Sequence, residues 1–135
     1  MSEDTSRLVR FHTVVPQFTV PNLVKTAEYY RDVLGFHIAD YWQTPPVFAI
    51  VWRDTVEVFF NQADGGDVRT GRARGAYDAY FRITGVEAFA AELRQRGAEI
   101  VDGPAVRVYD QREVAVKDCN GLVLAFGEPV NGGAS

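Results

Sequence analysis

The chain has 135 residues, of which 47% are hydrophobic and 24% are charged, and its formal net charge is -4. This length suits one hydrophobic core, so we expect residues 1–135 to form a single domain. The acidic balance disfavours nucleic acid as a partner, and no apolar run reaches the roughly 20 residues of a membrane helix. Since the N-terminus also lacks a signal-peptide pattern, we expect a cytoplasmic protein.

The first predicted element is an extended stretch over residues 11–20, which contains Pro16. Because proline cannot donate a ladder hydrogen bond, this strand is predicted to lie at a sheet edge or to leave its sheet at Pro16. Asn22 is the predicted N-cap of a helix that Gly35 ends. The apolar positions of this helix fall on one face at Leu23, Ala27, Tyr30 and Leu34.

Three strands are predicted to follow this helix, over residues 36–42, 47–52 and 55–61, with turns between them. Residues 11–61 thus form a first module with the order strand, helix and three strands. Residues 62–76 lack apolar periodicity and are predicted to connect the two halves. Three arginines in this connector are interpreted as a solvated basic loop: Arg69, Arg72 and Arg74.

The second half, residues 77–128, repeats the order of the first. A strand over residues 77–84 leads into a helix that stops at Gly97, and strands are predicted over 99–109, 112–117 and 122–127. The apolar stripe of this helix consists of Val86, Phe89, Ala90 and Leu93. The repeat predicts an α+β fold made of two βαβββ modules.

Two sequence stretches resemble the glyoxalase, bleomycin resistance protein and extradiol dioxygenase superfamily, also called the vicinal oxygen chelate fold. One runs from Val20 through the predicted helix to Phe36, and the other runs from Lys117 to Gly121 before the last strand. The resemblance covers residues 11–128 and implies curved mixed sheets around a cleft. It leaves the function open, because the superfamily contains lyases, isomerases, dioxygenases, thiol transferases and drug binders.

In the metal-dependent members the resemblance implies four ligands, two from each half. Counting from the matched residues places Val15, Glu57, Asp78 and Ala125 at these positions. Valine and alanine offer no lone pair, and two carboxylates alone hold a catalytic zinc, nickel or iron ion poorly. The sequence therefore predicts no metal and no cofactor.

Other side chains that carry chemistry in proteins offer no alternative centre. His12 and His37 fall outside the ligand pattern and are interpreted as surface or core side chains. Cys119 is the only cysteine and lies in a predicted turn. No Ser-His-Asp or Cys-His arrangement is evident, so no catalytic residue is predicted.

Without a metal, the predicted cleft is a small-molecule pocket with aromatic walls. Strand alternation puts Glu57 and Phe59 on its ligand-facing side and Val58 under the helix. Aromatic rings beside a carboxylate suit a flat or cationic ligand. The candidate ligand-binding residues are Glu57, Phe59, Trp52, Asp78, Trp42 and Tyr80.

Two alternatives remain for the carboxylates. Glu57 and Asp78 are strand residues that could form salt bridges with Arg53 or Arg82. In an enzyme of the same fold, a lyase, isomerase or dioxygenase, Glu57 would act as general base or as a metal ligand beside Asp78. The vacant ligand positions favour a protein that is not an enzyme, and the question stays open at this point.

Within the superfamily, the bleomycin resistance protein type is the most similar in appearance. Residues 48–54 and the following Val56-Glu57-Val58-Phe59 resemble the sequence pattern of this type. Pro16 also matches a proline near the first strand of this type. This resemblance implies a homodimer with exchanged N-terminal strands and two clefts between subunits. The sequence therefore predicts a metal-independent binding protein that sequesters an aromatic or cationic molecule, for example an antibiotic of the bleomycin type. A dimeric interaction module with an incidental cleft is a third hypothesis.

Overall fold

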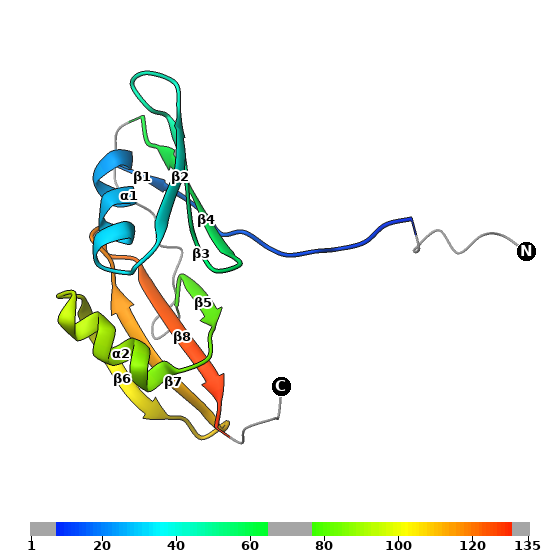
Figure 1. Cartoon of the computed structure of the whole chain (residues 1–135), viewed down its shortest axis with the longest axis vertical. Helices are drawn as coiled ribbons and strands as arrows, with labels where there is room; N and C mark the ends of the chain where they lie inside the picture. The colour runs from blue at the N-terminus through cyan, green and yellow to red at the C-terminus, as the bar shows by residue number, and fades with distance from the viewer. Residues whose placement is uncertain (1–7, 65–76, 131–135) are drawn as a thin grey trace, which may run out of the picture.

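The computed structural model describes residues 8–64 and 77–130, which form two βαβββ modules (Figure 1). The first module contains β1 (Gln17–Val20), α1 (Leu23–Asp32), β2 (His37–Trp42), β3 (Phe48–Arg53) and β4 (Val56–Gln62). The second contains β5 (Ala79–Arg82), α2 (Val86–Gln95), β6 (Glu99–Val106), β7 (Gln111–Lys117) and β8 (Val123–Pro129). The sheet order β1-β4-β3-β2 recurs as β5-β8-β7-β6, which confirms the duplicated α+β fold.

The strand predicted over residues 11–20 is too long. Only Gln17–Val20 joins the sheet, parallel to β4, and the ladder begins where Phe59 N–H donates to the carbonyl of Pro16 at 3.0 Å. Pro16 has no N–H to continue the ladder, and the preceding residues leave the sheet. Residues 8–16, called the N-terminal arm below, extend away from the body on the side opposite the helices (Figure 1).

The two ends of α1 are formed as its sequence predicts. The side chain of Asn22 accepts a hydrogen bond from Lys25 N–H at 3.1 Å. Gly35 follows the helix with a φ of 77°, which side-chain-bearing residues adopt at a cost. A Cβ at Gly35 would also collide with the Arg53 guanidinium and lie 2.9 Å from a carboxylate oxygen of Glu92. Glycine is therefore needed here both for the turn and for the close approach of the second module.

Helix α2 begins without a cap from its own segment, since Gly85 has no side chain to offer. Glu128 on β8 supplies the acceptors: Gly85 N–H donates to its Oε1 at 2.9 Å and Val86 N–H donates to its Oε2 at 2.8 Å. These backbone donors hold the pKa of the Glu128 carboxyl below its ordinary value. The first turn of α2 is thus capped by Glu128, which lies 42 residues after Val86 in the sequence.

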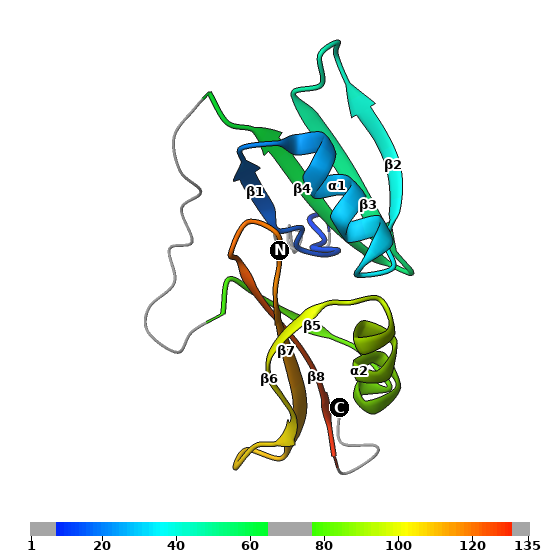
Figure 2. The same ribbon diagram turned by 90° about the vertical axis from the view of Figure 1, so that its left-hand side faces the viewer.

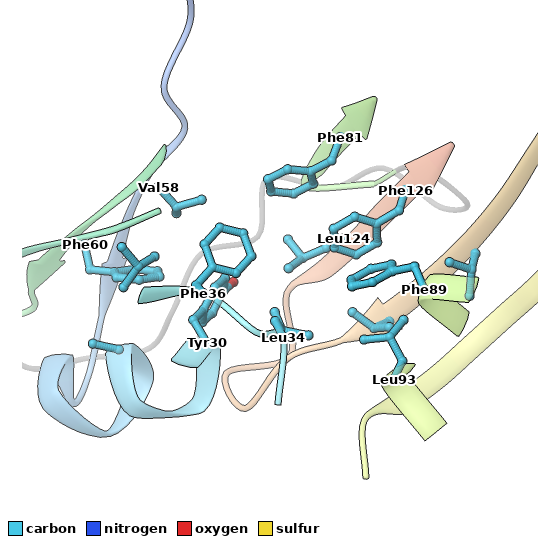
Figure 3. Close-up of a cluster of buried hydrophobic side chains, with 14 of the residues drawn as sticks. Tyr30, Leu34, Phe36, Val58, Phe60, Phe81, Phe89, Leu93, Leu124 and Phe126 are labelled. Atoms are coloured by element: carbon cyan, nitrogen blue, oxygen red, sulfur yellow. The ribbon is translucent and has the colours of Figure 1, made fainter. Parts of the chain in front are cut away.

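Both helices lie on the same side of the molecule, the near side in Figure 2, and each covers its own sheet. The predicted stripe of α2 is buried, and so are Val58 and Phe60 on the helix side of β4. One hydrophobic cluster spans both modules: Leu34 and Phe36 from the first lie close to Leu124 from the second (Figure 3). The two halves therefore share a core.

Polar contacts also join the modules, and each helix contacts a side chain of the other half. Tyr30 Oη donates to the buried carboxylate of Asp118 at 2.7 Å. On the other side, Arg53 donates twice to Glu92, at 2.7 and 3.0 Å. Arg53 was one of two possible partners of Glu57 and Asp78, but its planar guanidinium pairs with Glu92 across the module boundary.

The connector predicted over residues 62–76 begins after Gln62, which still belongs to β4. Arg69, Arg72 and Arg74 lie outside the described residues. Cys119 is exposed in the turn between β7 and β8, as predicted. Of the helices that the described residues form, none is long and apolar enough to cross a membrane.

Candidate functional site

The faces of the two sheets turned away from α1 and α2, called the open face below, carry most of the candidate residues. In the first sheet, Val51 and Val58 are paired and buried on the helix side. Strand alternation therefore turns the pair Trp52 and Glu57 to the open face, together with Phe59. The prediction that Glu57 and Phe59 lie on one face of β4 and Val58 on the other is confirmed.

Aromatic rings form a half-exposed surface on the open face of the first sheet. Phe48 contacts Trp42 and Phe59 with centroid distances of 5.4 and 5.3 Å. His37 is exposed and stacks on Trp52 at 4.4 Å. Rings held in such contacts lose little entropy when they meet a flat ligand, so this surface can stack on an aromatic molecule.

A pocket of about 480 Å³ lies where the start of β4 meets β5, and Thr13–Pro16 of the N-terminal arm form its third wall. Three of the six candidate residues line it: Glu57, Asp78 and Tyr80. The other three are outside its lining but lie in the first sheet: Trp52 pairs with Glu57, Phe59 follows Glu57 on the same face of β4, and Trp42 lies at the far end of the sheet, paired with Phe48. The structure thus gathers half of the predicted site around one pocket.

The four positions at which the resemblance implies metal ligands also gather here. Val15, Glu57 and Asp78 line the pocket, and Ala125 is fully buried beside Tyr80 in the β5–β8 pair. Asp78 Oδ2 already accepts the N–H of Val123 at 2.8 Å. Among residues 8–64 and 77–130, no three His, Cys, Asp or Glu side chains are grouped as metal ligands. The donor set, two carboxylates and two aliphatic side chains, does not fit a catalytic metal ion.

A larger pocket, of about 740 Å³, lies on the helix side between the β3–β4 turn and α2. Its walls include Phe36 and Phe89 and the Arg53–Glu92 ion pair, whose guanidinium lies 5.1 Å from the centre of the Phe89 ring. None of the six candidate residues lines it. We consider the smaller pocket the better candidate site, because three of the six candidate residues line it and none lines the larger one.

Sequence reasoning missed Glu113, a buried carboxylate on the open face of the second sheet. Tyr80 Oη donates to it at 2.7 Å and Tyr109 Oη at 2.8 Å. Burial and the bond to Glu113 raise the pKa of Tyr80. One sequence signal could have revealed it: Glu113 alternates with Val114 and Val116, so it belongs to the face opposite the core.

Comparisons with known proteins agree with this fold. The family model for the glyoxalase/bleomycin resistance protein/dioxygenase superfamily matches residues 10–126. No curated protein sequence matches the chain. Among solved structures, TioX from Micromonospora sp. ML1 is 13% identical with a TM-score of 0.71, covering 88% of this chain and 99% of its own.

Two further solved structures show the same fold at low identity. The bleomycin resistance determinant encoded on the transposon Tn5 is 18% identical with a TM-score of 0.69, covering 88% of this chain and 98% of its own. A glyoxalase/bleomycin resistance protein/dioxygenase from Nocardioides is 16% identical with a TM-score of 0.65, covering 95% and 91%. At these identities the likeness concerns the fold.

Proposed function

Because the chain belongs to the glyoxalase/bleomycin resistance protein/dioxygenase superfamily, we propose that it binds and sequesters a small molecule without a metal ion. The observation that carries the proposal is the character of the four ligand positions: Val15 and Ala125 are aliphatic, and they lie in or beside a pocket with Glu57 and Asp78. The pocket's volume of about 480 Å³ falls within the range usual for small-molecule sites. A ligand in this place meets protein side chains rather than a metal.

The ligand we propose is an aromatic or cationic molecule, with antibiotics of the bleomycin type as the first candidates. Glu57 supplies a negative charge, and Trp52 pairs with it across β3 and β4. Trp42 and Phe59 extend the aromatic surface on the same sheet. Similarity of fold to the Tn5 bleomycin resistance determinant supports this choice of ligand.

We further propose that the protein acts as a cytoplasmic homodimer. The N-terminal arm exposes Leu8, Val9, Phe11 and Val14 to solvent. Contiguous exposed apolar side chains of this kind favour contact with a second surface, and a second copy of the chain provides one. Since Thr13–Pro16 line the pocket, exchange of arms would make each pocket depend on both subunits.

Titration with bleomycin, followed by calorimetry or tryptophan fluorescence, tests the proposed function. We expect saturable binding, and we expect Glu57→Gln to weaken it about tenfold, since a hydrogen bond to a charged group contributes about 1.5–3 kcal/mol. Glu28→Gln, an exposed carboxylate on α1, is the matched control and should bind as the unmodified protein does. Absence of heat and of quenching at millimolar bleomycin would exclude the drug-binding version.

Elemental analysis of the purified protein tests metal independence. We expect substoichiometric zinc, nickel, manganese and iron, because two carboxylates without imidazole support bind these ions weakly. A stoichiometric metal that disappears in Glu57→Ala would contradict the proposal and favour the enzyme hypothesis.

A further inference from the structure

The larger pocket, of about 740 Å³, is a hollow that both modules build, and phenylalanine rings form its floor. Phe81 and Phe126 are stacked at a centroid distance of 4.9 Å, and Phe89 meets Phe126 edge-on at 4.8 Å. Phe36 adds a ring from the first module, and Figure 3 shows the four rings gathered where the modules meet. Each is at most 9% exposed, so neighbouring side chains hold the rings in place before a ligand arrives.

One wall of this pocket is the ion pair between Arg53 and Glu92. Arg53 donates to both carboxylate oxygens of Glu92, and its Nη1 also donates to the carbonyl of Leu34 at 3.0 Å. These three bonds fix the plane of the guanidinium, which lies 5.1 Å from the centre of the Phe89 ring. Because the carboxylate balances its charge, this flat group extends the aromatic floor as a stacking surface.

The charges of the whole lining also balance. Arg82 and Asp54 are exposed at the mouth, so the described lining residues contain two arginines and two carboxylates in all. A charged ligand would lose its water shell on entering, while the charges beside the floor already neutralise each other. The mouth also offers exposed hydroxyl groups, which suit an uncharged polar group: Thr55 and Thr84.

The rest of the chain is a poor filler for this hollow. The N-terminal arm extends on the side opposite the helices, whereas the pocket lies on the helix side (Figure 1). The sequences of residues 1–7, 65–76 and 131–135 contain no aromatic residue, leucine or isoleucine. The volume of the pocket falls within the range usual for small-molecule sites, so a separate molecule suits it better.

We propose that the larger pocket is a second binding site, which takes a flat, uncharged aromatic molecule that carries a hydroxyl or carbonyl group. The rings and the paired guanidinium contact the body of this molecule, and a threonine hydroxyl at the mouth bonds to its polar group. The site is distinct from the acidic pocket between β4 and β5, with which it shares one wall: Thr55, Val56, Phe81 and Arg82. It goes beyond the function proposed above, both in place and in the charge of its ligand.

Nuclear magnetic resonance of the isotope-labelled full chain tests the site with three probes that share one ring system: naphthol, naphthoate and naphthylmethylamine. The amides of Thr84 and Ala88 report on the larger pocket, and those of Asp78 and Tyr80 report on the smaller one. At Thr84 and Ala88 we expect saturable shifts, with naphthol binding about tenfold tighter than either charged probe. Equal affinities there would overturn the preference for an uncharged ligand. Shifts of Asp78 and Tyr80 alone, or none at millimolar naphthol, would overturn the site, while bleomycin binding would still test the smaller pocket.

Ala88→Trp fills the larger pocket from the exposed face of α2. We expect it to weaken naphthol binding, followed at Thr84, by about tenfold or more, since the indole occupies the space of the ligand. Ala91→Trp is the matched control, because Ala91 is also exposed on α2 but lies outside the lining, and it should bind naphthol as the unmodified protein does. Unchanged binding in Ala88→Trp, or equal losses in both variants, would contradict the proposal.

A second copy of the chain is the alternative occupant, since its N-terminal arm exposes apolar side chains. Sedimentation of the same two variants distinguishes the occupants. We expect Ala88→Trp and Ala91→Trp to sediment as the unmodified protein does, because a small-molecule site leaves the association of subunits unchanged. A shift toward the monomer in Ala88→Trp alone would assign the larger pocket to an interface between copies and overturn the small-molecule site.

Discussion

At the scale of single residues, Tyr29 and Tyr30 show how one step along a helix changes the role of a side chain. Tyr30 is fully buried and packs edge-on against Phe36 and Phe60, and its hydroxyl donates to Asp118 at 2.7 Å. Tyr29 is half-buried, and its hydroxyl bond to a backbone carbonyl is 3.4 Å long. Burial raises the pKa of Tyr29 to about 12, and burial followed by the charge of Asp118 raises the pKa of Tyr30 well above its ordinary value.

Removing each hydroxyl should therefore have unequal effects. Tyr30→Phe leaves a buried carboxylate oxygen of Asp118 without its phenol donor, so we expect the free energy of unfolding to fall by about 1–3 kcal/mol. Tyr29→Phe should change it by less than about 0.5 kcal/mol. Urea denaturation followed by tryptophan fluorescence measures both values. Equal losses in the two variants would refute this assignment.

At the scale of elements, α2 depends on a residue from another element for its first turn. Glu128 accepts the N–H groups of Gly85 and Val86, where a helix normally uses the side chain of its own N-cap residue. The negative charge also lies at the positive end of the helix dipole. Because β8 carries this carboxylate, the first turn of α2 gains its cap when the helix docks on its sheet.

This contact predicts a pH dependence of stability. The pKa of Glu128 is lowered in the folded state from an ordinary value of 4.5, so the unfolded chain takes up the proton first as the pH falls. The stabilisation is complete above the ordinary value and is lost as the pH falls through the folded pKa. We expect Glu128→Gln to lower the free energy of unfolding by about 1 kcal/mol at neutral pH and by little in acid.

Urea denaturation across this pH range measures the difference. Glu87→Gln is the matched control, since Glu87 is an exposed carboxylate in the first turn of the same helix and approaches Arg112 only to 3.7 Å. It should change stability less than Glu128→Gln does at neutral pH. A difference that persists unchanged in acid would show that the Glu128 charge is not the cause.

At the scale of the whole molecule, the two modules hold each other by reciprocal contacts, while the N-terminal arm extends away from the body and meets it at Thr13–Pro16, which line the smaller pocket. Phe11 is 94% exposed, and Leu8, Val9 and Val14 are exposed as well. Apolar surface of this kind is stable in water only at a cost of about 25 cal/mol per Å². The proposed homodimer would remove this cost by covering the arm with a second copy of the chain.

Sedimentation analysis tests this arrangement. We expect the full chain to sediment as a dimer and Phe11→Asp to shift it toward the monomer, because a charge cannot be buried in an apolar contact without a partner. Val108→Asp is the matched control, since Val108 is 101% exposed in the β6–β7 turn, far along the chain from the arm. A monomeric full chain, or equal shifts in both variants, would contradict the arm-mediated dimer.

The sequence by itself determined the features that depend on neighbours along the chain. The periodicities of 3.6 and 2.0 residues identified the helix stripes and the opposite faces of Val58 and Glu57. The repeat predicted the module order, and the family resemblance counted onto it placed Val15 and Asp78 at ligand positions, which line one pocket. These features follow from backbone geometry, which is the same wherever the pattern occurs.

Only the tertiary structure decided which distant side chains meet. The partner of Arg53 is Glu92, 39 residues away, and the partner of Tyr80 is Glu113, 33 residues away. The tertiary structure also decided where the first strand begins. The residues before Pro16 are extended in character, but the pairing with β4 begins only at Gln17. Such outcomes depend on the packing of one module against the other and on where a missing Cβ, as at Gly127, leaves room. The local periodicity of the sequence predicts neither the packing of the modules nor the space at Gly127.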